Sequence, residues 1–181
     1  MDSITPPQAE LACPGLDLRV AAASAVATLR YFAREGGFVR AVHEATDAVL
    51  PQTLQACEAG AGTMVLAWRS PTETLCVTAD PERLRELASR LVGEHDGQLI
   101  DMSGGLKVVR LHGERIADLL CRLGGRASVP QVGEARRSRL ADVPVLAFSV
   151  RAGDTCLIVD RGYLPHLLGW CRETLLDFAN P

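Results

Sequence analysis

The chain has 181 residues, a length that suits about one domain with a single buried core and no need of disulfide staples. Its formal charge of -3, with 48% apolar and 23% charged residues, is ordinary for a globular protein and lacks the basic surplus of a nucleic-acid-binding protein. The six cysteines stand apart without a C-x-x-C pair, which argues against a zinc site or a redox motif. We therefore expect reduced thiols in a cytoplasmic protein.

The N-terminal stretch MDSITPPQAE has an acidic residue where a signal peptide needs a basic one. We interpret residues 1–17 as a loose lead-in and residues 18–181 as a single domain. The longest apolar run, residues 20–29, has about half of the ~20 residues that a membrane helix needs. The sequence therefore predicts a soluble protein without membrane contact.

Helix and strand patterns alternate along the chain after residue 18. The segment 20–32 fits either a helix or a strand by composition alone. Apolar residues at helical spacing predict four later helices, within residues 36–50, 80–93, 113–125 and 160–178. Runs rich in β-branched residues predict strands at 63–68, 74–78, 97–102, 106–111, 143–148 and 155–159. This mixture indicates the α+β class.

Two of the helices carry informative details. Asp80 is expected to cap the second helix, which has Pro81 in its first turn and Gly93 just past its end. The first helix is the weakest of the four, with a stripe formed by Phe38, Val42, Ala45 and Val49.

The chain contains an internal repeat. Residues 65–91 align without a gap on residues 145–171, at a constant offset of 80, so that Trp68 meets Phe148. The same offset pairs Cys76 with Cys156, Arg30 with Arg110, and Asp80 with Asp160 as equivalent helix caps. Because Arg30 then falls in a strand, residues 26–32 are predicted as a strand too. We expect two pseudo-repeated strand-helix-hairpin-helix halves, about 18–102 and 103–181.

The turn at Gly113 lies between a predicted strand and a predicted helix, a position at which many nucleotide-binding proteins hold a phosphate. Neither the G-x-G-x-x-G fingerprint nor the G-x-x-x-x-G-K-[ST] loop is present there. The simpler interpretation is that Gly113 relieves crowding where the strand turns into the helix.

Four blocks of sequence resemble a known family. Residues 101–120 (DMSGGLKVVRLHGERIADLL) resemble a segment of the aminomethyltransferase-like superfamily, which includes the glycine-cleavage T-protein. Residues 67–75, 138–148 and 159–170 resemble blocks of the gamma subunit of heterotetrameric sarcosine oxidase, although Thr74 replaces a Trp of that family. The residues that carry the resemblance, and are expected to be structural, are Trp68, Pro71, Glu73, Asp101, Gly113, Pro144, Asp160, Arg161 and Trp170.

This resemblance implies an aminomethyltransferase-like domain that acts as a non-catalytic subunit and stabilises an oxidase complex. The family's complexes oxidatively demethylate sarcosine or another N-methyl amino acid, with FAD, FMN, NAD and tetrahydrofolate held by larger partner subunits. No catalytic, cofactor-binding or metal-binding residue is therefore expected in this chain. The alternative is a free-standing folate-binding or one-carbon-transfer protein. Folate-using members have an acidic residue on the strand that corresponds to 143–150, where this chain has none.

Other residues with chemical potential have simpler explanations. His95 beside Asp96 could form a base and its orienting group, but an exposed turn pair is the commoner arrangement. Cys76 and Cys156 are expected to be core residues. Trp68 and Trp170 could serve as interface anchors or as core residues.

Two segments are expected near the surface that meets the partner subunits. They are the loops 56–62 and 132–140, and the second contains the candidate interface residues Arg136, Arg137 and Arg139. A solvated loop remains the simpler interpretation of this basic run. If the chain is a companion subunit, its free form should expose an unusual amount of apolar surface.

Overall fold

The structure is a computed structural model that describes residues 11–179. All neighbouring strands within its two sheets run antiparallel. The strands of sheet A, in spatial order, are β1 (Leu11–Cys13), β2 (Leu16–Val20), β8 (Leu106–His112), β11 (Asp154–Asp160), β10 (Val143–Arg151) and β9 (Glu134–Leu140). Those of sheet B are β4 (Ala56–Ala59), β5 (Met64–Ser70), β6 (Glu73–Thr78), β3 (Ala25–Tyr31) and β7 (Gly97–Asp101).

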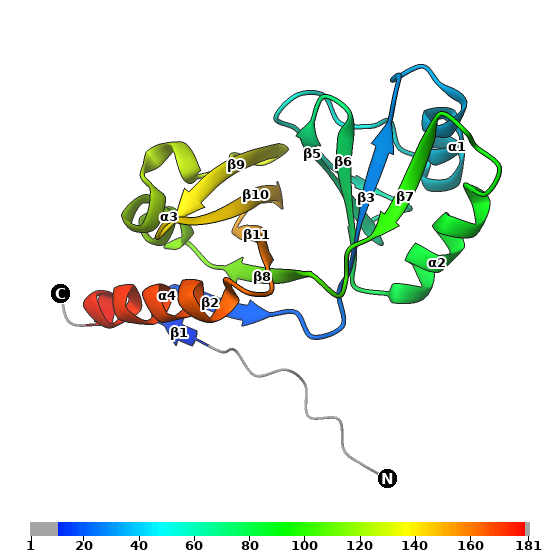
Figure 1. Cartoon of the computed structure of the whole chain (residues 1–181). Helices are drawn as coiled ribbons and strands as arrows, with labels where there is room; N and C mark the ends of the chain where they lie inside the picture. Colours follow the sequence, from blue (N-terminus) through cyan, green and yellow to red (C-terminus); the bar gives the residue numbers. More distant parts are fainter. Residues whose placement is uncertain (1–10, 180–181) are drawn as a thin grey trace, which may run out of the picture.

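Helices cover the outer face of each sheet (Figure 1). Sheet B carries α1 (Gly37–Thr46) and α2 (Pro81–Arg90), and sheet A carries α3 (Ile116–Gly124), the short 3-10 helix η1 (Arg126–Ser128) and α4 (Leu164–Ala179). One core lies under each helical layer, and a third core joins the inner faces of the two sheets. None of the helices in the described part of the chain is long and apolar enough to cross a membrane.

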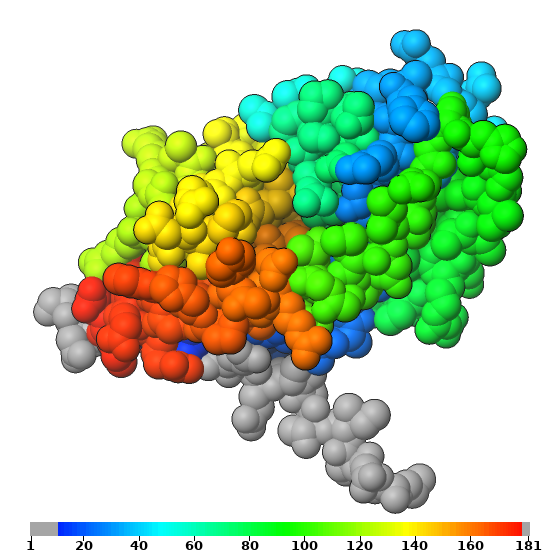
Figure 2. Space-filling view, viewed as in Figure 1, coloured from blue at the N-terminus to red at the C-terminus, as the bar shows by residue number. Residues whose placement is uncertain are grey.

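The two halves of the chain repeat one topology, as expected. The order β4-β5-β6-β3-β7 in sheet B matches the order β9-β10-β11-β8-β2 in sheet A. The N-terminal β2 therefore takes the place in sheet A that β7 takes in sheet B. In the space-filling view the halves meet along a continuous seam (Figure 2).

A main-chain bridge between the edge strands β4 and β9 marks the pseudo-twofold axis. Gln55 and Glu134 form an isolated antiparallel bridge. The Ala56 amide donates to the Gly133 carbonyl at 2.8 Å, and the Ala135 amide donates to the Leu54 carbonyl at 2.9 Å. Such reciprocal bonds are what a twofold relation between two similar units produces.

The predicted residue-by-residue equivalence of the halves is wrong by one position in the hairpins. Leu75 and Cys156 both pack in the core between the sheets, whereas Cys76 faces the helices. The residues opposite them, Ala67 and Phe148, are also both in the central core. Ala67 rather than Trp68 thus corresponds to Phe148. These strands are buried on both faces and lack an alternation of polar and apolar residues. The sequence pattern therefore did not reveal which residue of one half corresponds to which residue of the other.

The predicted match of Arg30 with Arg110 fails for the same reason. Leu75 lies opposite Thr28 on β3, and its counterpart Cys156 lies opposite Arg110 on β8. Arg110 therefore corresponds to Thr28, two residues before Arg30.

Helix ends agree with expectation at α2 and differ at α4. The Asp80 Oδ1 atom accepts the Glu82 amide at 3.0 Å, so Asp80 is the N-cap of α2. Asp160 does not cap α4; its Oδ1 atom accepts the Gly162 amide at 2.8 Å in a turn ahead of the helix. Val49 lies beyond the end of α1 and is 68% exposed, so it is not part of the core stripe.

Three segments expected to be irregular are strands. Residues 11–17 are not a loose lead-in, because β1 and the start of β2 lie there, with Leu16 buried; the rest of that lead-in is outside the described residues. Residues 56–59 and 134–140 form β4 and β9 instead of loops. The extent of the single domain stays a prediction.

Candidate functional site

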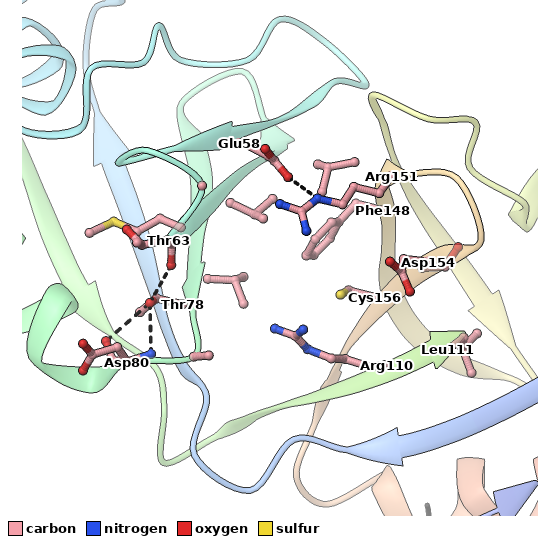
Figure 3. Close-up of a pocket in the computed structure, with 17 residues that line it drawn as sticks. Glu58, Thr63, Thr78, Asp80, Arg110, Leu111, Phe148, Arg151, Asp154 and Cys156 are labelled. Carbon is pink, nitrogen blue, oxygen red and sulfur yellow. Dashed lines mark hydrogen bonds and ion pairs between the residues drawn. The ribbon is translucent and has the colours of Figure 1, made fainter. Parts of the chain in front are cut away.

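A cleft of about 430 Å³ opens between the inner faces of the two sheets (Figure 3). One wall comes from the β4–β5 turn and the end of β6, and the other from β8, β10 and β11. The polar residues of its lining are Glu58, Thr63, Thr78, Asp80, Arg110, Arg151, Asp154 and Thr155. Because it joins both halves, only the tertiary structure assembles it.

Most polar groups of the cleft are already bonded to one another. The Arg151 Nε atom donates to Glu58 Oε1 at 2.6 Å, and this bond raises the pKa of the arginine. The Thr78 hydroxyl donates to the Thr63 carbonyl at 2.9 Å. Arg110 points from β8 into the cleft and forms no ion pair within residues 11–179. Among the described residues that line the cleft, Arg110 is the cation left to meet an external group.

Cys156 lies directly opposite Arg110 on the neighbouring strand. Burial raises the pKa of this thiol to about 11, although the Arg110 charge opposes the shift. A thiol with such a pKa is almost entirely protonated at neutral pH, and a protonated thiol is a poor nucleophile. Burial likewise raises the pKa of Cys76 and of Cys171 to about 12. All six cysteines are free, and these three behave as core residues.

The histidines form no buried acid–base pair with a nucleophile in the part of the chain that the structure describes. His112 Nδ1 lies 2.7 Å from Asp154 Oδ1 at the rim of the cleft, with both side chains at least half exposed. Asp96 is the expected orienting partner of His95. It instead accepts the Phe38 amide at 2.8 Å, and so provides an acceptor for a backbone N–H in the first turn of α1 that has no partner within the helix. Within the described residues no group of His, Cys, Asp and Glu could hold a metal ion.

The turn at Gly113 does not fit a phosphate. Its φ is +131°, and a Cβ at this position would lie 2.8 Å from the Gly15 carbonyl carbon. The Gly113 amide already donates to the Gly153 carbonyl at 2.9 Å. Neither space nor a free donor is left, so Gly113 serves the close packing of the β1–β2 turn against the start of α3.

The signature residues in sheet B are scattered over its surface and ends. Trp68 is half-buried on β5, and Pro71 is exposed in the β5–β6 turn. Glu73 pairs with Arg30 at 2.5 Å. Asp101 accepts the Ser103 hydroxyl at 2.6 Å and the Ser103 amide at 2.9 Å, and these bonds lower the pKa of its carboxyl.

The signature residues of the second half are also peripheral. Pro144 is exposed on β10, and the Arg161 amide donates to the Gly105 carbonyl at 2.7 Å. Trp170 is 51% exposed on α4, where its ring and that of His166 form a T-shaped pair with centroids 6.5 Å apart. The structure does not gather the signature residues into one site.

The three arginines of β9 lie on opposite faces of the strand. Arg136 faces the helical side and pairs with Glu134 at 2.8 Å. Arg137 and Arg139 share the other face with buried Ala135. Arg139 lies 3.8 Å from Asp142, and Arg137 has no ion pair in the described part of the chain. The predicted single basic patch is therefore wrong, because Glu134–Leu140 is a strand and its successive side chains point to opposite faces.

The cleft residues Glu58, Arg110 and Arg151 were not recognised in the sequence. They come from β4, β8 and β10, and no local spacing connects them. The only available signal was indirect: Arg110 is a charged residue in an otherwise apolar strand pattern, LKVVRL.

Comparisons with known proteins first define the class. No family model matches the chain. The fold is that of the aminomethyltransferases: aminomethyltransferase T of the glycine cleavage system from Bartonella henselae superposes with a TM-score of 0.65 at 13% identity, over 87% of this chain and 45% of that one. Heterotetrameric sarcosine oxidase from Corynebacterium sp. U-96, solved in complex with pyrrole 2-carboxylate, has a chain that superposes with a TM-score of 0.79 at 25% identity, over 96% of this chain and 90% of that one.

Sequence relatives then identify the family. The sarcosine oxidase gamma subunit of an Arthrobacter species is 31% identical over 138 residues, which span 73% of this chain and 66% of that protein. The gamma subunit from Corynebacterium sp. strain P-1 is 26% identical over 149 residues, which span 80% of this chain and 72% of that protein. The chain belongs to the family of sarcosine oxidase gamma subunits. This confirms the resemblance that four short blocks of sequence indicated.

Proposed function

We propose that this chain is a gamma-type subunit of a flavin-dependent oxidase of sarcosine or a related N-methyl amino acid, and that it stabilises the assembly of that complex. The observation that carries the proposal is the likeness to a chain of the heterotetrameric enzyme over nearly the whole length of both. In this proposal FAD, FMN, NAD and tetrahydrofolate belong to the larger partner subunits, and the complex works in the cytoplasm.

The chemistry of the cleft supports a structural role. Its thiol stays protonated, its His112–Asp154 pair is open to solvent, and its other carboxylates are held by neighbours. A general base needs a nearby group to deprotonate, and no such pairing is formed by these side chains. The alternative of a free-standing folate-binding or one-carbon-transfer protein has only the shared fold in its favour, and a fold does not imply a reaction.

The surface around the pseudo-twofold bridge has features of a partner-binding patch. Leu54 is 44% exposed and Val132 is 58% exposed, on either side of the β4–β9 bridge. Leu54 also has a φ of +62°, a conformation that costs about 1 kcal/mol for a residue with a Cβ. Leu54 thus combines a strained backbone with an exposed apolar side chain, and neither feature stabilises the free chain. Contact with a partner would account for both. Together with Arg137, whose guanidinium forms no ion pair with any residue in 11–179, these residues form the proposed bridge patch.

Co-expression with the two flavin-associated subunits tests the proposal. The wild-type chain should co-elute with them from a size-exclusion column, and alone it should be colourless and without oxidase activity. Arg137→Glu should weaken assembly about tenfold, because a buried repulsion replaces a charge-assisted contact. Arg40→Glu, an equally drastic change at an exposed position on α1, is the matched control and should assemble normally.

Two results would count against it. If the wild-type chain fails to co-elute, the subunit assignment is wrong. If Arg137→Glu assembles like Arg40→Glu, the bridge patch is not the interface.

A further inference from the structure

The two sheets differ by one strand although their halves share one topology. Sheet A has six strands and sheet B has five. The extra strand is β1, which pairs antiparallel with β2, placing Leu11 opposite Leu18 and Cys13 opposite Leu16. Its side chains Leu11 and Cys13 pack on the core of sheet A, and α4 lies against it. β7, the counterpart of β2, has no such neighbour within residues 11–179 (Figure 1).

The outer edge of β7 presents main-chain groups that the sheet does not use. The Phe32 amide donates to the Asp96 carbonyl at 3.0 Å, and the Met102 amide donates to the Val26 carbonyl at 2.8 Å. Since bonds to one neighbour recur at every second residue of an antiparallel strand, Gly97, Leu99 and Asp101 turn their amides and carbonyls outward. β2 turns Leu16, Leu18 and Val20 outward in the same way, and β1 pairs with that edge.

Two of the usual protections of an edge strand are absent from β7. The sequence of β7, GQLID, contains no lysine and no proline, the residues that commonly block strand addition at an edge. An open edge of this kind in a soluble protein is commonly a place where another chain pairs.

A groove of about 420 Å³ lies beside this edge, between β7 and α2. Its apolar lining includes Leu84 and Ala88 from α2 and Leu99 from β7. The chain segment 22–25 closes one side, and the charged residues of the lining are Arg85, Asp101 and Lys107. Lys107 lines one end and forms no ion pair within the described residues. The groove is the counterpart of the space that Leu11 and Cys13 fill in sheet A, between β2 and α4.

We propose that the β7–α2 groove receives an extended segment of a partner polypeptide, which adds to sheet B as an antiparallel sixth strand. Its main chain bonds to Gly97, Leu99 and Asp101, and its apolar side chains, at every second position, enter the groove as those of β1 do in the other half. An acidic residue of the segment meets Lys107. This rests on the proposed function, which supplies the partner: one of the larger subunits of the oxidase complex.

Hydrogen–deuterium exchange on the chain, free and in its purified complex, tests the proposal at the level of single amides. The amides of Leu99 and Asp101 should exchange about tenfold more slowly, or slower still, in the complex, because they gain bonds there. The amides of Gln98 and Ile100 already bond to β3 and should change less. Unchanged exchange of Leu99 and Asp101 in an intact complex overturns the strand addition and leaves the proposed function standing.

A pair of variants on α2 separates groove occupation from mere stability. Ala88→Arg fills the groove, and Ser89→Arg places the same side chain on the exposed neighbouring position of the helix. We expect Ala88→Arg to weaken assembly about tenfold and to abolish the slowing at Leu99, with Ser89→Arg near wild type. Equal assembly of both variants, or protection of Leu99 by self-association of the chain alone, overturns the proposal. Failure of the wild-type chain to join any oxidase complex overturns the proposed function and this partner with it.

Discussion

Gly113 lies where β8 ends and the chain turns toward α3, with its backbone against the turn that joins β1 and β2. Two separate costs would follow from a side chain here. One is the positive φ of +131°, and the other is the clash with Gly15. The residue therefore ties the N-terminal hairpin to the second half, a role unrelated to phosphate binding.

Gly113→Ala should lower the free energy of unfolding by at least about 2 kcal/mol, because strain and clash add. Gly153→Ala is the matched control, since Gly153 also has a positive φ, +75°, but has open space around its Cβ position. Its cost should be about 1 kcal/mol. Urea denaturation of the three proteins measures both values, and equal losses would show that the contact with Gly15 is unimportant.

The elements that sequence patterns predicted well are those with local signals. The helix α2 has a capping aspartate, a proline in its first turn and buried Leu84 and Leu87 at helical spacing. The strand β9 was missed, because its sequence EARRSRL alternates charged residues with Ala135 and Leu140 too sparsely for an apolar strand pattern. What makes it a strand is pairing with β10 along its whole length.

Removal of the Asp80 side chain, the N-cap of α2, should lower the stability of the protein. Asp80→Ala should lower the free energy of unfolding by about 1 kcal/mol, because the Glu82 amide loses its acceptor. Asp80→Asn keeps an acceptor oxygen and should stay within a few tenths of the wild type. The urea midpoint, at an unchanged m-value, is the measure. A loss as large for Asn as for Ala would assign the effect to the charge of Asp80 rather than to the cap.

The whole molecule is held by contacts between segments far apart in the chain. The β4–β9 bridge joins the two halves at one edge, and the central core joins the inner faces of the sheets. The N-terminal β2 completes the sheet of the second half, beside β8. Each half therefore depends on residues outside its own repeat.

Deletion of residues 1–13 should destabilise the whole chain. It removes β1, so that Leu11 and Cys13 no longer cover the core of sheet A and α4 loses its neighbour. Two half-buried side chains correspond to a loss of about 2 kcal/mol in the free energy of unfolding. Thermal and urea denaturation measure it, with a deletion of residues 1–9 as the control that leaves β1 whole. Equal stability of the two deletions would mean that β1 adds nothing to the fold.

Local and repeated patterns in the sequence were sufficient for the fold class, the four helices, seven of the strands and the family. Apolar spacing, helix caps and short blocks that resemble the family carry that information, and each of these signals lies within one short segment of the chain. The one-residue slip between the halves, the strands β1, β2, β4 and β9, and the cleft around Arg110 depended on long-range pairing. A strand buried on both faces has no polar alternation, and an edge strand is recognised by its neighbour, so the register and the assembled sites are set by packing between distant segments.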